Sequence, residues 1–264
     1  MEKNITFIII LSAIIFTNCE NEQVVEISDS YIEKVVVRAE LVKDSLFQGV
    51  SITRTLPLNQ PYDFNYAEFE SFTGYLRIND TVIVPLHYTE NGIYKPLHSL
   101  RIKGNKKYEL IANAGGTQIY AETFIPDTTV IIKSYFKDNI FLEARIIPNS
   151  HYSYGAVWAI QSSVNPVFAD DFFSIVEPLS NSGTINVQTK EFSLNYLNNP
   201  GLRIQVYAFD KNFTPYFKTK KYSQSITNTF GQGGGSVTWN VKGENVIGIF
   251  IGYARSQLIK PDRD

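Results

Sequence analysis

Cysteine is almost absent from this chain of 264 residues, which holds one, at position 19. A small secreted domain held together by disulfides is therefore excluded, because no intramolecular pair can form. Charge is also sparse, since Asp, Glu, Lys and Arg make up only 19% of the residues and the formal net charge is −2. This composition provides no basic surface for phosphates, so we expect no nucleic-acid partner.

The usual motifs of metal binding and nucleophilic catalysis are missing as well. The three histidines, His87, His98 and His151, fit neither a His-x-x-x-His nor a His-Glu-x-x-His spacing, so a zinc site has no support. No Gly-x-Ser-x-Gly elbow occurs, and such an elbow is how many hydrolases present their serine. We therefore expect no metal, no cofactor and no enzymatic activity.

The N-terminus, by contrast, has the pattern of a secretion signal. Residues 1–19 read MEKNITFIIILSAIIFTNC, with Lys3 before an apolar run over 5–16. This run is shorter than the ~20 residues that span a bilayer, which favours a signal peptide over a transmembrane helix. The run ends just before Cys19, as in lipoprotein signals, whose cysteine is acylated and becomes the first residue of the mature chain. We predict a signal peptide over 1–18 and a lipid anchor on Cys19.

The residues before the cysteine depart from the usual lipobox. Phe16, Thr17 and Asn18 stand where Leu is common at the first position and a small residue at the last. Lipoprotein signals of Bacteroidota have a looser pattern, and this one resembles them. The alternative is an ordinary signal peptide followed by an incidental cysteine.

An acidic segment over 19–30 follows the signal. Glu20, Asn21 and Glu22 come directly after the cysteine and resemble the signal that exports Bacteroidota lipoproteins to the outer face of the outer membrane. The alternative is a solvated acidic tether with no signalling role. We expect the mature protein to be anchored in the outer membrane and to face the exterior.

From residue 31 the pattern changes to short runs rich in β-branched and aromatic residues, separated by turn pairs at 79–80, 91–92 and 115–116. Such spacing is typical of strands joined by hairpins, and about seven of them in a hundred residues predict an immunoglobulin-like β-sandwich over 31–126. The predicted strands cover 34–42, 50–56, 72–78, 81–88, 93–94, 108–112 and 117–123.

The second half continues in the same way after a boundary at 126–129. We predict a second β-rich domain over 130–259, with one short helix at 214–224, where Tyr216, Phe217 and Tyr222 can share a face. The expected fold class is all-β, with two β-sandwich domains. The predicted strands here cover 130–136, 140–147, 156–161, 172–176, 184–192, 202–209, 237–241 and 246–253.

Several stretches together resemble the DUF4249 family of Bacteroidota lipoproteins, from Cys19 to about Arg255. They read VVVRAEL at 35–41, ITR at 52–54, PYD at 61–63, YEL at 108–110, YAETFIP at 120–126, VYAF at 206–209, YF at 216–217 and NVIGIFIGYA at 245–254. Two departures are the GQGGGS loop at 231–236 and Ile251, where the family often has Gly. The resemblance implies a lipoprotein that works beside a TonB-dependent, SusC-like receptor, and it brings no catalytic residues.

Aromatic residues are abundant, with sixteen tyrosines and eighteen phenylalanines. Tyr152, Tyr154 and Trp158 lie close together in one predicted strand and form our candidate platform for stacking a sugar or a peptide. The alternative is that these side chains fill the core.

Three sites match the Asp-Ser/Thr-apolar motif of O-glycosylation in exported Bacteroidota proteins. The hydroxyl residues are Ser45, Thr81 and Thr128, each at a predicted turn or linker where a sugar would stay in water. Matches to a three-residue motif also arise by chance.

These patterns favour a non-catalytic binding or accessory module on the outer membrane. The alternatives are a structural subunit of the cell envelope, such as a fimbrillin-like assembly protein, and a hydrolase whose site the sequence does not reveal.

Overall fold

The structure is a computed structural model, and it describes residues 31–57, 60–69, 71–161, 167–168, 171–224 and 237–263. The chain divides into two compact units, Met1–Ile32 and Glu33–Asp264, and every strand described belongs to the second unit. The predicted signal peptide, Cys19 and the export-signal residues Glu20, Asn21 and Glu22 lie outside the described residues.

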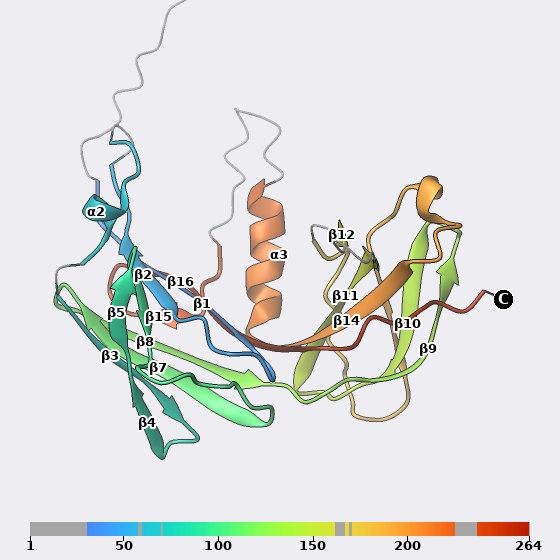
Figure 1. The fold of residues 1–264 in the computed structure, drawn as a ribbon, viewed down its shortest axis with the longest axis horizontal. Coiled ribbons are helices and arrows are strands. Elements are labelled where there is room, and N and C mark those ends of the chain that lie inside the picture. Colours follow the sequence, from blue (N-terminus) through green and yellow to red (C-terminus); the bar gives the residue numbers. More distant parts are fainter. Residues whose placement is uncertain are drawn as a thin grey trace, which may run out of the picture. The chain divides into compact units, whose positions relative to one another are not determined.

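The largest sheet has eight strands and joins the beginning of the second unit to its end (Figure 1). The last strand of this sheet in the chain pairs in parallel with the whole of the first, and its residues 253–255 also pair antiparallel with a third strand. The order across the sheet is β12 (Val167–Phe168), β11 (Tyr152–Ile160), β14 (Leu202–Asp210), β16 (Val246–Arg255), β1 (Val35–Val42), β2 (Val50–Arg54), β6 (Ile93–Lys95) and β5 (His87–Glu90).

Two smaller sheets cover this large one, and the all-β prediction is confirmed. One sheet has the order β15 (Val241–Lys242), β8 (Thr117–Ile125), β7 (Lys106–Ala114), β3 (Phe72–Ile78) and β4 (Val82–Pro85). The other has the order β13 (Ile185–Gln188), β10 (Phe141–Ile147) and β9 (Val130–Lys137). The helical elements are α2 (Phe64–Ala67), the 3₁₀ turn η1 (Leu194–Tyr196) and α3 (Phe213–Gln224), and α3 confirms the predicted short helix.

Strand alternation builds two separate cores. Successive side chains of a strand point to opposite faces, and along β1 the buried residues are Val35, Val37, Ala39 and Leu41. They belong to the first core, together with residues of the five-stranded sheet such as Leu110. The second core joins β11 and β14 to the three-stranded sheet. Two sandwiches therefore share the eight-stranded sheet.

The C-terminal strands complete the first core. Val241, Val246 and Phe250 are buried in it, although the predicted division places them in the second domain at 130–259. The physical reason is the parallel pairing of β1 with β16. These strands come from opposite ends of the unit, and no local pattern indicates which distant strand fills an open sheet position.

The turn predictions are confirmed at 79–80, 91–92 and 115–116, where each pair connects two antiparallel strands and holds positive φ angles. The strand predicted at 172–176 is wrong, since only Val176 makes a bridge, to Tyr154. The segment crosses over β11 instead, with the ring of Phe172 against Gly155, where an added Cβ would collide with it.

Candidate binding groove

The outer face of the large sheet is apolar where β1, β16 and β14 lie side by side. The residues of β1 that point away from the first core are Val36, Arg38 and Glu40, and β16 adds Ile247 and Ile249 to the same surface. Both isoleucines and Val36 are only partly buried. The sheet therefore has a second apolar face that the two cores do not use.

Helix α3 stands on this face (Figure 1). Two residues separate it from β14, and there the backbone N–H of Asn212 donates to the Asp210 carboxylate at 3.1 Å. Pro215 occupies the first turn of α3, where a missing N–H costs nothing. Phe213 stacks on Phe209 of β14 with 4.1 Å between ring centroids, and Phe217 is buried. Aromatic packing thus fixes the helix to the sheet.

A groove of about 470 Å³ lies between α3 and the sheet. This volume is within the usual range of small-molecule sites. Aliphatic residues of β1 and β16, such as Val36, Ile247 and Ile249, form the floor of the groove. Most of the wall is aromatic, with Phe172, Tyr207, Phe209, Phe213, Tyr216, Phe217, Trp239 and Tyr253. Phe172 meets Tyr207 edge-to-face at 5.2 Å, so the wall is a connected aromatic cluster.

Charged groups of both signs lie at the rim. Arg38 and Glu40 are 3.8 Å apart, Asp171 lines the groove, and the Lys220 ammonium lies over the Tyr216 ring at 5.8 Å. Trp239 is 37% exposed, and its ring centroid lies 5.8 Å from that of Tyr216. A ligand in the groove would meet an apolar wall and a charged margin.

Two tyrosine hydroxyls inside the groove stay protonated. Burial raises the pKa of Tyr207, and burial together with the Glu40 carboxylate raises the pKa of Tyr253. The Tyr253 hydroxyl donates to Glu40 at 3.3 Å and that of Tyr207 donates to Gln205 at 3.1 Å. Both phenols are therefore neutral hydrogen-bonding groups at physiological pH.

The lining is mainly aromatic and aliphatic. Among the described residues the lining holds no histidine, cysteine, serine or threonine, so it contains no Ser–His or Cys–His pair. In the same part of the chain, no three His, Cys, Asp or Glu side chains gather as metal ligands. His87, His98 and His151 are each exposed.

The predicted aromatic platform lies elsewhere. Tyr152 and Tyr154 are 8% and 2% exposed and belong to the second core. Trp158 packs against that core, with its indole N–H donating to the Glu191 carbonyl at 3.3 Å. Tyr152 and Tyr154 therefore have no open face for a stacked ligand, whereas Trp158 is only half-buried.

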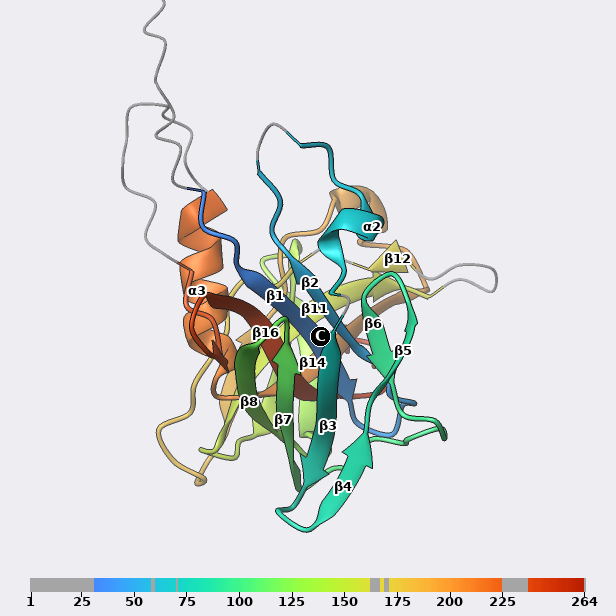
Figure 2. The ribbon, with the colours of Figure 1, turned by 90° about the vertical axis from the view of Figure 1, so that its left-hand side faces the viewer.

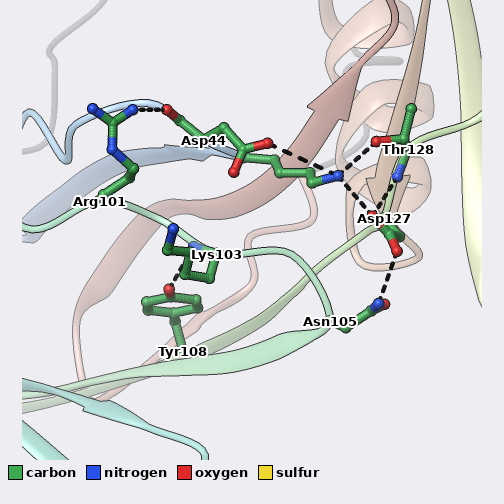
Figure 3. A network of polar contacts seen from close by, with 8 residues as sticks. Asp44, Arg101, Lys103, Asn105, Tyr108, Asp127 and Thr128 are labelled. Carbon is green, nitrogen blue, oxygen red and sulfur yellow. Dashed lines mark hydrogen bonds and ion pairs between the residues drawn. The ribbon is translucent and has the colours of Figure 1, made fainter.

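The three candidate glycosylation sites lie at turns and linkers, as expected from their sequence positions. Thr81 is exposed in the turn between β3 and β4, and Ser45 is half-buried just after β1. Thr128 is exposed between β8 and β9, within a polar network (Figure 3). There the Lys43 ammonium donates to both the Thr128 hydroxyl and the Asp127 carboxylate at 2.6 Å.

The groove was not predicted from the sequence. The one signal in the sequence is the shared face of Tyr216 and Phe217 on the predicted helix. However, the floor comes from β1 and β16, and only their pairing brings Val36 and Ile247 together.

Comparisons with known proteins leave the family open. No family model matches the chain, and no curated protein sequence matches it. A solved structure of a DUF4785 family protein from Legionella pneumophila is similar over 67% of this chain, at 11% identity and a TM-score of 0.26. The chain spans about half the length of that protein, 52%. The resemblance to DUF4249 stays a prediction.

No helix in the described part of the chain combines the length and the apolar character that a membrane span requires.

Proposed function

We propose that this protein is a lipid-anchored, non-catalytic binding module of a Bacteroidota outer membrane, and that the groove beneath α3 holds its ligand. The observation that carries the proposal is the aromatic wall in which Phe213, Tyr216 and Trp239 stay partly exposed, on a sheet face that neither core uses. An apolar cavity with a few polar groups is the usual form of a ligand site.

The anchor part of the proposal is supported by the sequence around Cys19. An acylated cysteine followed by acidic residues would hold the module at the cell surface, and the predicted partner there is a TonB-dependent, SusC-like receptor. Co-purification of a β-barrel protein with the acylated chain from native membranes tests this partnership.

The lining indicates the class of ligand. The wall offers aromatic and aliphatic contacts, while Arg38, Glu40, Asp171 and Lys220 provide charges of both signs at the margin. This combination fits a short peptide with apolar side chains, whose ends and amides can meet the charged rim.

Intrinsic fluorescence tests the ligand site. A Trp158→Phe variant leaves Trp239, at the groove, as the only tryptophan. Titration with apolar tetrapeptides should shift its emission to shorter wavelength. Ile249→Arg, which fills the groove, should abolish the shift, and Val82→Arg, on an exposed edge strand, should preserve it. If both arginine variants respond alike, the groove is not the site.

A structural subunit is the second candidate, and one observation favours it. The edge strand β4 exposes Val82 and Ile83, by 53% and 61%, and an exposed apolar edge can pair with another chain. Sedimentation velocity over a range of concentrations tests this alternative. Assembly that Ile83→Lys abolishes would favour the structural role.

A further inference from the structure

Three aromatic side chains stand exposed within residues 62–66, in the long connection between β2 and β3. Tyr62 and Tyr66 are each 61% exposed and Phe64 is 43% exposed. The rings of Tyr62 and Phe64 meet edge-to-face at 5.3 Å, and helix α2 holds the segment. We refer to Tyr62, Phe64 and Tyr66 as the aromatic tip. Three exposed rings within residues 62–66 are the kind of apolar exposure that marks an interaction site.

The aromatic tip lies at the end of the sheet where the chain enters the fold. Glu33 is the first residue of the second unit, and its carboxylate is 3.3 Å from the Arg54 guanidinium. Arg54 also donates to the carbonyl of Glu68 at 2.9 Å, and Glu68 caps α2, because its own N–H donates to the Phe64 carbonyl. Arg54 therefore links Glu33, where the fold begins, to Glu68, which ends the helix that carries the aromatic tip.

The two ribbon views place this end away from the β3–β4 hairpin. In both, α2 and the hairpin that ends in β4 lie at opposite ends of the first sandwich (Figures 1 and 2). Val82 is 53% exposed at that distant hairpin, so the chain offers an apolar site of similar exposure as an internal comparison.

Chain length limits the distance between this end and the membrane. The inference rests on the proposed lipid at Cys19, fourteen positions before Glu33 in the sequence. Fourteen residues span about 50 Å even when fully extended. The chain would therefore be tethered to the bilayer through the end of the fold that bears the aromatic tip, within a reach of about 50 Å.

The residue types of the tip suit the interfacial region of a bilayer. Tyrosine places an apolar ring among the acyl chains and a hydroxyl among the headgroups, and tyrosine is enriched at that depth in membrane proteins. Acidic Asp63 and Glu68 flank the rings, so the contact is apolar and does not depend on attraction to anionic lipid. We propose that the aromatic tip rests in the headgroup region of the membrane that holds the Cys19 lipid.

Depth-dependent fluorescence quenching tests the proposal on the acylated full chain. Both native tryptophans are replaced by phenylalanine, and a single reporter is introduced by Tyr66→Trp or, as the matched control, by Val82→Trp. Each protein is placed in phosphatidylethanolamine and phosphatidylglycerol vesicles that contain brominated lipid. We expect strong quenching and a blue-shifted emission for the reporter at position 66, and neither effect at position 82.

The outcomes separate the two proposals. A chain that lacks acylation and does not float with the vesicles overturns the lipid anchor itself. A chain that is acylated and floats, but whose reporter at 66 is quenched no more than the one at 82, overturns the aromatic tip alone. Quenching restricted to native membranes, with none in protein-free vesicles, would assign the tip to a protein partner and also overturn the inference. Tyr62→Trp replaces the first reporter if Tyr66→Trp fails to fold.

A binding assay gives a second readout. In the mature chain with Cys19→Ser, replacing all three rings by serine should weaken partitioning into the same vesicles about tenfold, since each buried ring contributes apolar transfer energy. Unchanged partitioning would contradict the proposal.

Discussion

Arg77 on β3 donates two hydrogen bonds to Glu109, its direct partner across the pair on β7, at 2.8 and 2.9 Å. The Glu109 side chain is only 2% exposed, and the Tyr120 hydroxyl donates to the same carboxylate at 2.9 Å. The Arg77 guanidinium beside Glu109 lowers the pKa of that carboxyl to about 2. A bidentate pair with a buried carboxylate holds its partners more firmly than an exposed ion pair does, and removing one partner leaves the other without its charge-assisted bonds.

The first prediction concerns Glu109 and pH. Glu109→Gln removes the charge and should lower the free energy of unfolding by about 2 kcal/mol at pH 7, because Arg77 and Tyr120 lose their charged acceptor. The folded pKa lies below the ordinary value of 4.5, so this stabilisation is complete above pH 4.5 and is lost as the pH falls from 4.5 toward 2. Urea denaturation at pH 7 and pH 3 measures the free energy of unfolding, and the difference between the wild type and Glu109→Gln should be smaller at pH 3. Glu244→Gln, at an exposed position, is the control, and a constant difference would contradict the prediction.

The second prediction concerns the attachment of α3. Phe213→Ala removes the ring that stacks on Phe209 at 4.1 Å. Since Phe213 is only half-buried, we expect a cost of about 2 kcal/mol, below the roughly 3–5 kcal/mol of a fully buried Phe, and this cost should fall mainly on the helix. Hydrogen exchange should become faster at residues 213–220 while β11 stays protected. Leu179→Ala, at a fully exposed side chain, should change neither region. Equally faster exchange in residues 213–220 and in β11 would show that α3 does not unfold separately from the rest of the fold.

The predictable and the unpredictable parts of this fold differ in the range of the interactions that make them. The hairpins at 79–80 and 115–116 and helix α3 were predicted correctly, because their signals lie within a few neighbouring residues. The pairing of β1 with β16 was not predicted, since nothing in either segment specifies a partner at the other end of the unit.

The groove shows the same limit. Tyr152 and Tyr154 were predicted to bind a ligand and Tyr207 and Tyr253 were not, because a sequence does not tell which face of a strand meets a core. β11 turns its tyrosines inward to the second core, whereas β14 turns Tyr207 outward beneath α3.

The third prediction concerns the connection between the two halves. The Asp210 carboxylate on β14 accepts hydrogen bonds from the Thr123 hydroxyl at 3.0 Å and from the Phe124 N–H at 2.6 Å, both on β8. Asp210→Ala should lower the free energy of unfolding by about 1–3 kcal/mol, because Thr123 is buried and loses a partner. Thermal denaturation measures the loss, with Glu191→Ala at an exposed side chain as the control. Equal melting temperatures for the two variants would rule out a stabilising role for this link.

The fourth prediction concerns glycosylation. Of the three candidate sites, Thr81 should be modified most fully, since it is exposed in a tight turn. A sugar on Thr128 would displace Lys43 from its hydroxyl, and Ser45 is half-buried. The intact mass of protein expressed in a Bacteroidota host should exceed the polypeptide mass, and Thr81→Ala should remove the largest increment. A mass equal to that of the acylated polypeptide would end the hypothesis.

The fifth prediction tests the strand pair that closes the large sheet. Gly248 on β16 lies opposite Val37 of β1 and has a φ of +143°, and an added Cβ would collide with the Val37 carbonyl oxygen. Gly248→Ala must therefore separate the two strands, so we expect a loss of several kcal/mol or of the folded protein altogether. Gly116→Ala is the matched control, because its φ is also positive, at +87°, but its Cβ would meet open space, which leaves only about 1 kcal/mol of backbone strain. Soluble yield and melting temperature compare the two variants. If Gly248→Ala melts no lower than Gly116→Ala, then β1 and β16 are not parallel neighbours, and the floor of the groove that they form is not assembled as described.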